Sequence, residues 1–413
     1  MGMNETPLSE RVHIAFFGRR NAGKSSLINA LTGQDIALVS PVKGTTTDPV
    51  YKAMELLPVG PVVFIDTAGL DDEGELGELR KKKSIEVLEK TDMAIVVIDR
   101  LDDFSTVELD IIEKIKEKKI PIVGAVNKID ICPVDEGLLK EYEKKLGIRL
   151  CPVSAEKGIG IGELKEAIID ALPVDESKFS IVGDLLSPGD LVVLVVPIDK
   201  AAPKGRLILP QQQVIRDVLE SDAIAVVTKE HELKDTLENL GKKPRLVITD
   251  SQVFLKVAAD TPKNIPMTSF SILFARHKGN LAELVKGARA VETLQDGDRV
   301  LIAEACTHHR QADDIGTVKI PRWLRQRTGK QLDFHFSRGM SFPDNLKDFK
   351  LIVHCGGCML NKRAMGYRIE QAMRAGTPIV NYGVLIAYIQ GILERAISPF
   401  RLEEIVLEEE LSD

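Results

Sequence analysis

Three cysteines in the C-terminal half of the chain have the spacing and the neighbours of a metal site. Cys306 opens the run Cys306-Thr307-His308-His309, and the other two lie in His354-Cys355-Gly356-Gly357-Cys358. Two thiolates three positions apart can bind one metal ion or cluster, and the glycines between them let the backbone approach it. Together the two runs predict a metal centre with Cys306, Cys355 and Cys358 as ligands.

Three kinds of metal site compete for these residues. Zinc would take three cysteines and one histidine in a closed tetrahedron. A Rieske cluster needs Cys-x-His followed by Cys-x-x-His, whereas the second run here ends in Cys358. A 4Fe-4S cluster with three thiolates and one weaker or exchangeable ligand fits the pattern best. The fourth ligand stays open among His308, His354 and the carboxylates of Asp313 or Asp314.

A second site is predicted near the start of the chain. The stretch Gly18-Arg19-Arg20-Asn21-Ala22-Gly23-Lys24-Ser25-Ser26 follows an apolar run and opens a helical one, which is the context of a phosphate-binding loop. Glycines allow the tight turn that points backbone N–H groups at phosphate, and the helix N-terminus adds partial positive charge. We expect Lys24 to contact the β- and γ-phosphates and the Ser25 hydroxyl to bind Mg²⁺.

Two further motifs predict the remaining contacts of this nucleotide. Asp66-Thr67-Ala68-Gly69 follows an apolar run, so Asp66 can hold Mg²⁺ through water while the Gly69 N–H meets the γ-phosphate. In Asn127-Lys128-Ile129-Asp130 a carboxylate can accept two protons from guanine, and adenine lacks that pair of donors. Because a site with such buried polar groups rejects the wrong base, the sequence favours GTP over ATP. Ser154-Ala155 falls where a backbone loop would contact the guanine oxygen.

The loop Gly44-Thr45-Thr46-Thr47-Asp48 lies between these motifs, and one of its threonines could complete the Mg²⁺ shell. Here the chain resembles the TrmE-Era-like branch of GTPases, whose loop reads Gly-x-Thr-Arg-Asp. The resemblance implies Thr46 as the Mg²⁺ ligand, with its two threonine neighbours as alternatives, and Asn21 as a residue that helps to hold K⁺. Leu70 stands where Ras-like enzymes carry the glutamine that orients water. Slow hydrolysis that K⁺ stimulates is therefore expected.

The full prediction for the nucleotide site combines these motifs. The predicted catalytic residues are Lys24, Asn21 and Thr46. The predicted nucleotide-binding residues are Gly18, Asn21, Ala22, Gly23, Lys24, Ser25, Ser26, Asp66, Gly69, Asn127, Lys128, Asp130, Ser154 and Ala155. Residues 66–83 should respond to the γ-phosphate, so a conformational or partner-release switch is the hypothesis for the role of hydrolysis.

As a whole the chain resembles the HydF family, the GTPases of FeFe-hydrogenase maturation. The resemblance covers all 413 residues, with the GTPase motifs, a three-part layout, and Cys-x-His followed at long range by His-Cys-x-x-Cys. It implies a scaffold that holds a precursor of the di-iron subcluster, assembled with two radical-SAM maturases, and delivers it to apo FeFe-hydrogenase. It also implies a homodimer formed through the middle domain.

The predicted fold class is α/β: a P-loop GTPase domain with a parallel sheet, followed by two smaller α/β domains. Short apolar runs between helical patterns indicate buried parallel strands. The predicted strands are residues 12–17, 62–65, 94–98, 122–126, 191–196, 223–227, 246–249, 271–275, 299–304, 351–354 and 379–381. The predicted domains are 1–174, 178–262 and 263–413, with a linker at 172–177. Because Cys306 and Cys355 each follow a strand, they are expected at one sheet edge.

The composition limits the remaining classes of function. No apolar run approaches the roughly 20 residues that cross a bilayer, and the polar start lacks the core of a signal peptide, so a cytoplasmic protein with reduced thiols is expected. With a net charge of -7 and a pI near 5.7, the chain has no overall positive electrostatic field that would attract nucleic acid. An RNA or ribosome-assembly GTPase with structural zinc stays as the alternative function, and a redox-sensing GTPase as a third.

Overall fold

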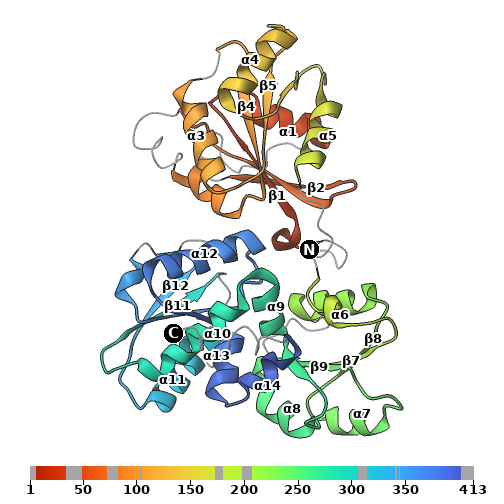
Figure 1. Ribbon diagram of the computed structural model, residues 1–413, viewed down its shortest axis with the longest axis vertical. Coiled ribbons are helices and arrows are strands. Elements are labelled where there is room, and N and C mark those ends of the chain that lie inside the picture. The colour runs from red at the N-terminus through yellow and green to blue at the C-terminus, as the bar shows by residue number, and fades with distance from the viewer. Residues whose placement is uncertain are drawn as a thin grey trace. The chain divides into compact units, whose positions relative to one another are not determined.

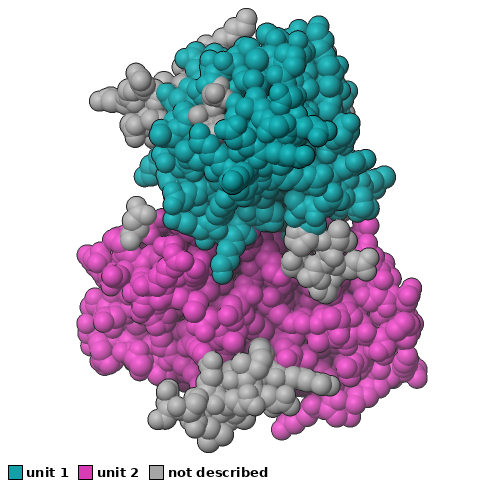
Figure 2. Space-filling model, turned by 45° about the horizontal axis from the view of Figure 1, so that its top comes forward, with its two compact units in different colours: residues 1–174 teal, residues 175–413 magenta. Residues whose placement is uncertain are grey.

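The computed structural model describes residues 6–33, 49–71, 82–102, 105–172, 180–197, 207–305, 314–339, 342–343 and 345–400. The chain divides into two compact units, residues 1–174 and residues 175–413, which Figure 2 colours separately. Each unit is an α/β structure with its own sheets. Within the described residues no helix is long and apolar enough to cross a membrane.

The N-terminal unit is built on a six-stranded sheet in the order β2-β3-β1-β4-β5-β6. Its strands are β1 (Val12–Phe17), β2 (Val50–Leu56), β3 (Gly60–Asp66), β4 (Met93–Asp99), β5 (Ile122–Asn127) and β6 (Leu150–Pro152). All neighbouring pairs are parallel except β2 and β3, which are antiparallel. The predicted strands of this unit are confirmed, and β2 and β6 are additional.

Helices cover both faces of this sheet (Figure 1). The helices are α1 (Lys24–Thr32), α3 (Thr106–Glu117), α4 (Glu136–Leu146) and α5 (Ile161–Ala171). Apolar residues of α1 and α5 pack on one face, and those of α3 and α4 pack on the other. Every residue of β4 is buried, as expected for a parallel strand that is covered on both sides.

The C-terminal unit contains two four-stranded parallel sheets with the same strand order. The first follows the order β10-β9-β7-β8, with β7 (Leu191–Val195), β8 (Ile224–Thr228), β9 (Leu246–Thr249) and β10 (Met267–Ser269). The second follows the order β12-β11-β13-β14, with β11 (Arg299–Glu304), β12 (Asp333–Arg338), β13 (Leu351–His354) and β14 (Ile379–Asn381). In each sheet, the second strand along the chain pairs with one side of the first strand. The third strand pairs with the other side of the first strand, so the strand order reverses there. Ligands bind at such a reversal, beyond the carboxyl ends of the strands.

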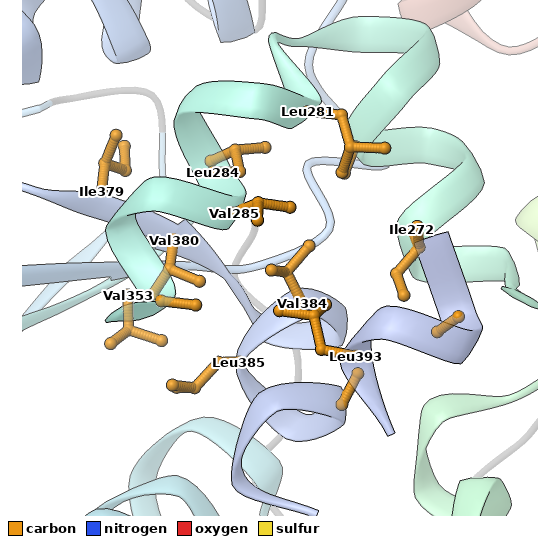
Figure 3. Packing of buried hydrophobic residues seen from close by; sticks show 14 of the residues in the cluster. Ile272, Leu281, Leu284, Val285, Val353, Ile379, Val380, Val384, Leu385 and Leu393 are labelled. Carbon is orange, nitrogen blue, oxygen red and sulfur yellow. The ribbon is translucent and has the colours of Figure 1, made fainter. Parts of the chain in front are cut away.

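Nine α-helices surround these two sheets in the part of the C-terminal unit that the structure describes. They are α6 (Leu209–Glu220), α7 (Leu233–Asn239), α8 (Phe254–Asp260), α9 (Phe270–Lys278), α10 (Leu281–Arg289), α11 (Ile320–Thr328), α12 (Lys362–Ala375), α13 (Tyr382–Ile389) and α14 (Leu393–Ile397). One hydrophobic cluster joins both sheets, because it includes buried residues of β7 and β9 as well as of β11, β13 and β14. Figure 3 shows part of it, where Val285 of α10 and Val384 of α13 lie near Val380 of β14.

The prediction of a strand at residues 271–275 is wrong, because these residues lie in α9. The side chain of Ser269 caps the helix by accepting a hydrogen bond from the backbone N–H of Ile272 at 3.2 Å. Ile272 and Leu273 are both fully buried. The short run therefore lacks the alternation of apolar and polar residues that would indicate a helix. The other predicted strands of this unit are confirmed, and the predicted fold class is confirmed as well. The domain boundary at residue 262 stays a prediction.

Candidate nucleotide and metal sites

The phosphate-binding loop connects β1 to α1 and contains two positions that only glycine can fill. Gly18 has φ +149°, and a Cβ there would lie 2.3 Å from the carbonyl oxygen of Val97. Gly23 has φ +94°, and a Cβ there would lie 2.2 Å from the side-chain nitrogen of Asn127. Asn21 also adopts a left-handed conformation, with φ 61°. The loop is therefore fixed by close contacts with β4 and β5.

Lys24 is the buried cation of this loop. Its exposed fraction is 7%, and its ammonium donates hydrogen bonds to the carbonyl oxygens of Gly18 at 3.0 Å and Arg19 at 2.8 Å. A charge held inside a ring of backbone groups suits the binding of phosphate oxygens. Ala22 is fully buried, whereas Asn21 and Ser26 are exposed.

Ser25 and Asp66 form a pair of oxygen groups that fits Mg²⁺. The Ser25 hydroxyl donates a hydrogen bond to one oxygen of Asp66. The other carboxylate oxygen, Oδ1, is buried and has no hydrogen-bond partner among the described residues. Burial raises the pKa of Asp66, while the bond from Ser25 and the charges of Lys24 and Lys52 act against the rise. Mg²⁺ prefers oxygen ligands, and it would satisfy the unpaired oxygen.

The Asp66-Thr67-Ala68-Gly69 segment lies directly against the phosphate-binding loop. A Cβ at Gly69 would lie 2.8 Å from the backbone nitrogen of Arg20. The Leu70 N–H donates to the carbonyl oxygen of Gly18 at 3.3 Å, and the Arg20 N–H donates to the carboxylate of Asp71. These backbone contacts join the two phosphate motifs. Thr46, the predicted Mg²⁺ ligand, lies outside the described residues.

Asn127 joins the phosphate-binding loop to the loop predicted to contact guanine. Its amide nitrogen donates to the Ala22 carbonyl at 2.9 Å, and its oxygen accepts from the Ala155 N–H at 3.0 Å. Ser154 is fully buried, and its hydroxyl accepts from the Lys157 N–H at 3.1 Å. The structure thus brings the two ends of the predicted site together.

The next two residues of the motif differ in their surroundings. Lys128 has φ 69°, and its ammonium donates to the carboxylate of Asp99, which is 5% exposed. Asp130 is exposed, so its carboxylate is accessible to a base. The geometry allows the predicted contact of Asp130 with guanine, while Asn127 holds the two loops together.

One ion pair of this site was not predicted. Arg19 donates its Nε–H to the Oε1 atom of Glu108 at 2.7 Å, and the side chain of Glu108 is fully buried. The other oxygen of Glu108 accepts from the N–H and hydroxyl of Ser105 at 2.9 Å and 2.7 Å. The Ser-x-x-Glu spacing signals a helix cap, but nothing in the local sequence links it to the phosphate-binding loop 89 residues away.

In the C-terminal unit, Cys355 follows β13 at the reversal between β11 and β13. Its N–H donates to the Ala303 carbonyl at 2.9 Å, and its sulfur accepts from the Ala305 N–H at 3.2 Å. Burial raises the pKa of the Cys355 thiol, whereas the N–H groups of Ala305 and Gly357 oppose that rise. Backbone N–H groups aimed at sulfur stabilise the thiolate, which is the form that binds metal.

His354, a predicted candidate for the fourth ligand, is fully buried and has both ring nitrogens occupied. Nδ1 lies 2.7 Å from the Cys355 carbonyl oxygen, and Nε2 lies 2.8 Å from Nη1 of Arg368. Burial and then the charge of Arg368 lower the pKa of His354 to about 3, so the ring is neutral. His354 would have to break one of these bonds to bind a metal, and its role as a ligand stays a prediction.

The rest of the predicted metal site is only partly described. Cys358 is half-buried in the turn before α12. Cys306, His308 and Asp313 lie outside the described residues. Within the residues that the structure covers, no group of three or more His, Cys, Asp or Glu side chains could hold a metal ion. The two described thiols fit part of a thiolate site, and their partner Cys306 stays a prediction.

A buried acid and a phenol beside this loop were also missed from the sequence. Glu304, the last residue of β11, is 5% exposed, and the hydroxyl of Tyr382 donates to its Oε1 atom at 3.3 Å. Burial and the nearby charges of Glu304 and Cys355 raise the pKa of Tyr382, so its hydroxyl keeps the proton. Gly316 makes room for both, because a Cβ there would lie 2.2 Å from the phenol oxygen. These polar groups lie at the same end of the sheet as the cysteines.

Comparison with protein-family models matches most of the chain in three parts. Residues 13–128 match the 50S ribosome-binding GTPase model, residues 181–279 the hydrogen maturase F dimerization domain, and residues 282–399 the hydrogen maturase F tetramerization domain. The chain belongs to the hydrogen maturase F family. Its N-terminal unit is accordingly a GTPase domain, and its C-terminal unit carries the two domains after which these models are named.

Several curated proteins are similar to the GTPase part of the chain. The tRNA modification GTPase MnmE of Aquifex aeolicus is 36% identical over 163 residues, which are 39% of this chain and 35% of that protein. GTPase Era of Halothermothrix orenii is 33% identical over 165 residues, 39% of this chain and 55% of that protein. The chain thus spans about a third to a half of these relatives. Among solved structures, the G domain of the T. maritima FeoB iron transporter is 26% identical, with a TM-score of 0.32. The match covers 40% of this chain and 99% of the FeoB chain.

Proposed function

We propose that this chain is a GTP-hydrolysing scaffold that carries a 4Fe-4S cluster and a di-iron precursor during the maturation of FeFe-hydrogenase. The observation that carries the proposal is the union of a GTPase domain with two hydrogen maturase F domains in one chain. The proposed partners are two radical-SAM maturases, which assemble the precursor, and apo FeFe-hydrogenase, which receives it in the cytoplasm.

In the proposed hydrolysis, water attacks the γ-phosphate, the bond to the bridging oxygen breaks, and GDP and phosphate leave. The ammonium of Lys24, already held inside the loop, would contact the β- and γ-phosphates and stabilise the charge that develops there. Ser25 and Asp66 would hold Mg²⁺, which supplies further positive charge when bound. Asn21 would help to hold K⁺, which we propose as the stimulating ion, and Thr46 would complete the Mg²⁺ shell.

The preference for guanine rests on the opposite end of the site. The exposed carboxylate of Asp130 would accept the two donors of guanine, while Asn127 holds the Ser154-Ala155 loop against the phosphate-binding loop. The Ala155 region would then face the guanine oxygen. Adenine has an acceptor rather than a donor at N1, so it would leave this carboxylate without a partner once the base covers it, which disfavours ATP.

For the cluster, we propose Cys306, Cys355 and Cys358 as the three thiolate ligands. The N–H groups of Ala305 and Gly357 would lower the negative charge on the sulfur of Cys355. His308, His354 and Asp313 are the candidates for the fourth iron. An iron with an exchangeable ligand can accept another group, which suits a protein that holds its cargo only for a time.

The oligomeric state and the role of hydrolysis are part of the same proposal. The names of the two matched domains support a homodimer and its further association. We infer that hydrolysis switches the binding of partners through residues 66–83. If dissociation of a radical-SAM maturase is the same with GTP and GDP, and is unchanged by a Lys24→Ala substitution, the switch is excluded.

The test of the cluster is metal analysis with electron paramagnetic resonance on anaerobically reconstituted protein. About four irons per chain are expected, with a reducible signal that Cys355→Ser loses and Cys132→Ser keeps. Cys132 is the control because it is a half-buried cysteine outside the cluster motifs. One tightly held zinc with salt-dependent binding to ribosomal RNA would overturn the proposal in favour of a ribosome-assembly GTPase, in line with the ribosome-binding description of the N-terminal match.

A further inference from the structure

Arg368 in α12 is a buried cation that lies behind the cysteine loop. Its exposed fraction is 3%, although arginine is almost never buried to this extent without a specific partner. Its Nη1 atom lies 2.8 Å from Nε2 of His354, and its Nη2 atom donates to the carbonyl oxygen of Gly339 at 3.0 Å. The guanidinium carbon also lies 5.1 Å from the centroid of the Phe342 ring. The guanidinium therefore links the last residue of β13 to the turn that follows β12.

These contacts determine which nitrogen of His354 carries the proton. A guanidinium has only donors, so Nε2 must be the acceptor of the bond from Arg368. The proton of the neutral ring is then on Nδ1, which donates to the Cys355 carbonyl at 2.7 Å. The chain of bonds runs from Arg368 through the imidazole to the backbone of the first cysteine of Cys355-Gly356-Gly357-Cys358.

We propose that Arg368 is a positioning residue of the cysteine loop, and that His354 is the strut through which it acts rather than a ligand of iron. This inference rests on the proposed cluster-binding function. It removes His354 from the candidates for the fourth ligand, because neither ring nitrogen has a lone pair left for a metal while both bonds are made. The fourth ligand then comes from another group.

His354 and the neighbouring strand together restrain Cys355 at both of its backbone polar groups. The Cys355 carbonyl is held by His354, and the Cys355 N–H is held by the Ala303 carbonyl of the neighbouring strand. The sulfur then has a fixed direction, toward the Ala305 N–H at 3.2 Å. Groups that orient metal ligands in this way typically contribute roughly 10- to 100-fold to metal affinity.

The first test uses the full-length protein without iron, so its outcome does not depend on whether a cluster forms. Long-range proton-nitrogen NMR spectra of protein labelled with nitrogen-15 histidine report the tautomer of each ring, and His354→Gln identifies the signals of His354. We expect the Nδ1-protonated neutral tautomer at pH 7.5, and a shifted Nε2 resonance in Arg368→Met, which removes the donor to that nitrogen. A His354 ring protonated at Nε2, or a spectrum unchanged by Arg368→Met, would overturn the proposal.

The second test follows the reconstituted cluster in the Arg368 variants. Arg368→Lys keeps the charge but cannot reach both acceptors, and it remains useful if Arg368→Met does not fold. We expect iron affinity to fall roughly 10- to 100-fold in either variant. The control Arg374→Met lies on the same helix with a side chain that is 68% exposed, and it should bind iron as the unchanged protein does. Equal affinity in all variants would contradict a positioning role.

A spectroscopic readout separates the strut from a ligand. If His354 does not bind iron, the nitrogen hyperfine couplings of the reduced cluster should be the same in His354→Gln and in the unchanged protein. Loss of an imidazole coupling in His354→Gln would assign His354 to the iron and overturn the inference. Absence of any cluster in the unchanged protein would instead contradict the proposed function, while the NMR result on the iron-free protein would still decide the role of Arg368.

Discussion

The side-chain amide of Asn127 donates to the backbone carbonyl of Ala22 at 2.9 Å, so the end of β5 and the phosphate-binding loop are joined by one bond. The same amide accepts from the Ala155 N–H at 3.0 Å. Asn127 is 3% exposed, and a Cβ at Gly23 would collide with it. The phosphate end and the base end of the site therefore share a single buried side chain.

Replacing Asn127 by aspartate should weaken guanine nucleotide binding. The carboxylate cannot donate to the Ala22 carbonyl, and it places negative charge beside that oxygen. The expected loss is about 1–3 kcal/mol, or roughly 5- to 150-fold in affinity, measured by fluorescence titration with a labelled GDP. Asn239→Asp is the control, because Asn239 makes an exposed bond within α7. Equal affinity in the two variants would show that the bridge contributes nothing.

Removing the charge of Lys24 should slow hydrolysis much more than it changes the fold. In Lys24→Met the buried cation that faces the phosphate position is lost, and a single preorganised donor of this kind is worth roughly 10²–10³ in turnover. Phosphate release measured at saturating GTP checks the expectation. Lys140→Met serves as the matched control, since the Lys140 side chain is 76% exposed on α4. A rate within twofold of the unchanged protein would remove Lys24 from the catalytic residues.

Glu108→Gln should destabilise the N-terminal unit. The substitution leaves the half-buried guanidinium of Arg19 without its carboxylate partner, and the loss of a hydrogen-bonded charged partner costs about 1–3 kcal/mol. Hydrogen exchange of peptides from the phosphate-binding loop and α3, followed by mass spectrometry, should show faster exchange. Glu113→Gln on the exposed side of α3 should leave exchange unchanged. If both variants exchange alike, the Arg19–Glu108 pair does not hold the loop.

His13 should make the stability of β1 depend on pH. Burial lowers the pKa of His13 to about 4 from its ordinary value of 6.5, although Asp92 Oδ2 lies 3.7 Å from its Nδ1 atom. The unfolded chain therefore binds a proton that the folded chain excludes, and stability falls as the pH drops from about 6.5 toward about 4. The full difference is about 3 kcal/mol.

The measurement for His13 is hydrogen exchange of β1 peptides at pH 7 and at pH 5, corrected for the intrinsic rate. His13→Gln should flatten the pH dependence, because glutamine does not titrate. His231→Gln is the control, since the His231 side chain is 73% exposed. A pH dependence that is the same in both variants would assign the effect to other groups.

Local motifs could be predicted from the sequence, whereas contacts between distant residues could not. The phosphate-binding loop is a short run of fixed spacing, and its flanking strand and helix follow from apolar runs of ordinary length. The Arg19–Glu108 pair joins residues 89 positions apart, and charged residues of either sign are common in both segments. Only the packing of α3 against the sheet selects Glu108.

Two of the errors in secondary structure have different causes. Residues 272–275 are four successive buried residues within a helix, so they resemble a buried strand. β12 was not predicted because it is an edge strand with a mixed polar sequence and no fully buried residue. For the predicted metal site, the spacing of Cys355 and Cys358 can be read from the sequence, but the occupation of both nitrogens of His354 depends on Arg368 in α12.

Because the two C-terminal sheets have the same strand order, equivalent positions in them can be compared. Asp250 follows β9 in the first sheet at the place that Cys355 takes after β13 in the second. The carboxylate of Asp250 accepts a hydrogen bond from the Gln252 N–H at 2.9 Å and caps the turn that follows, whereas the sulfur of Cys355 receives an N–H from the strand beside it. The same scaffold position thus caps a turn in one sheet and holds a thiol in the other, so the first sheet shows how the backbone is arranged at this position without a cysteine.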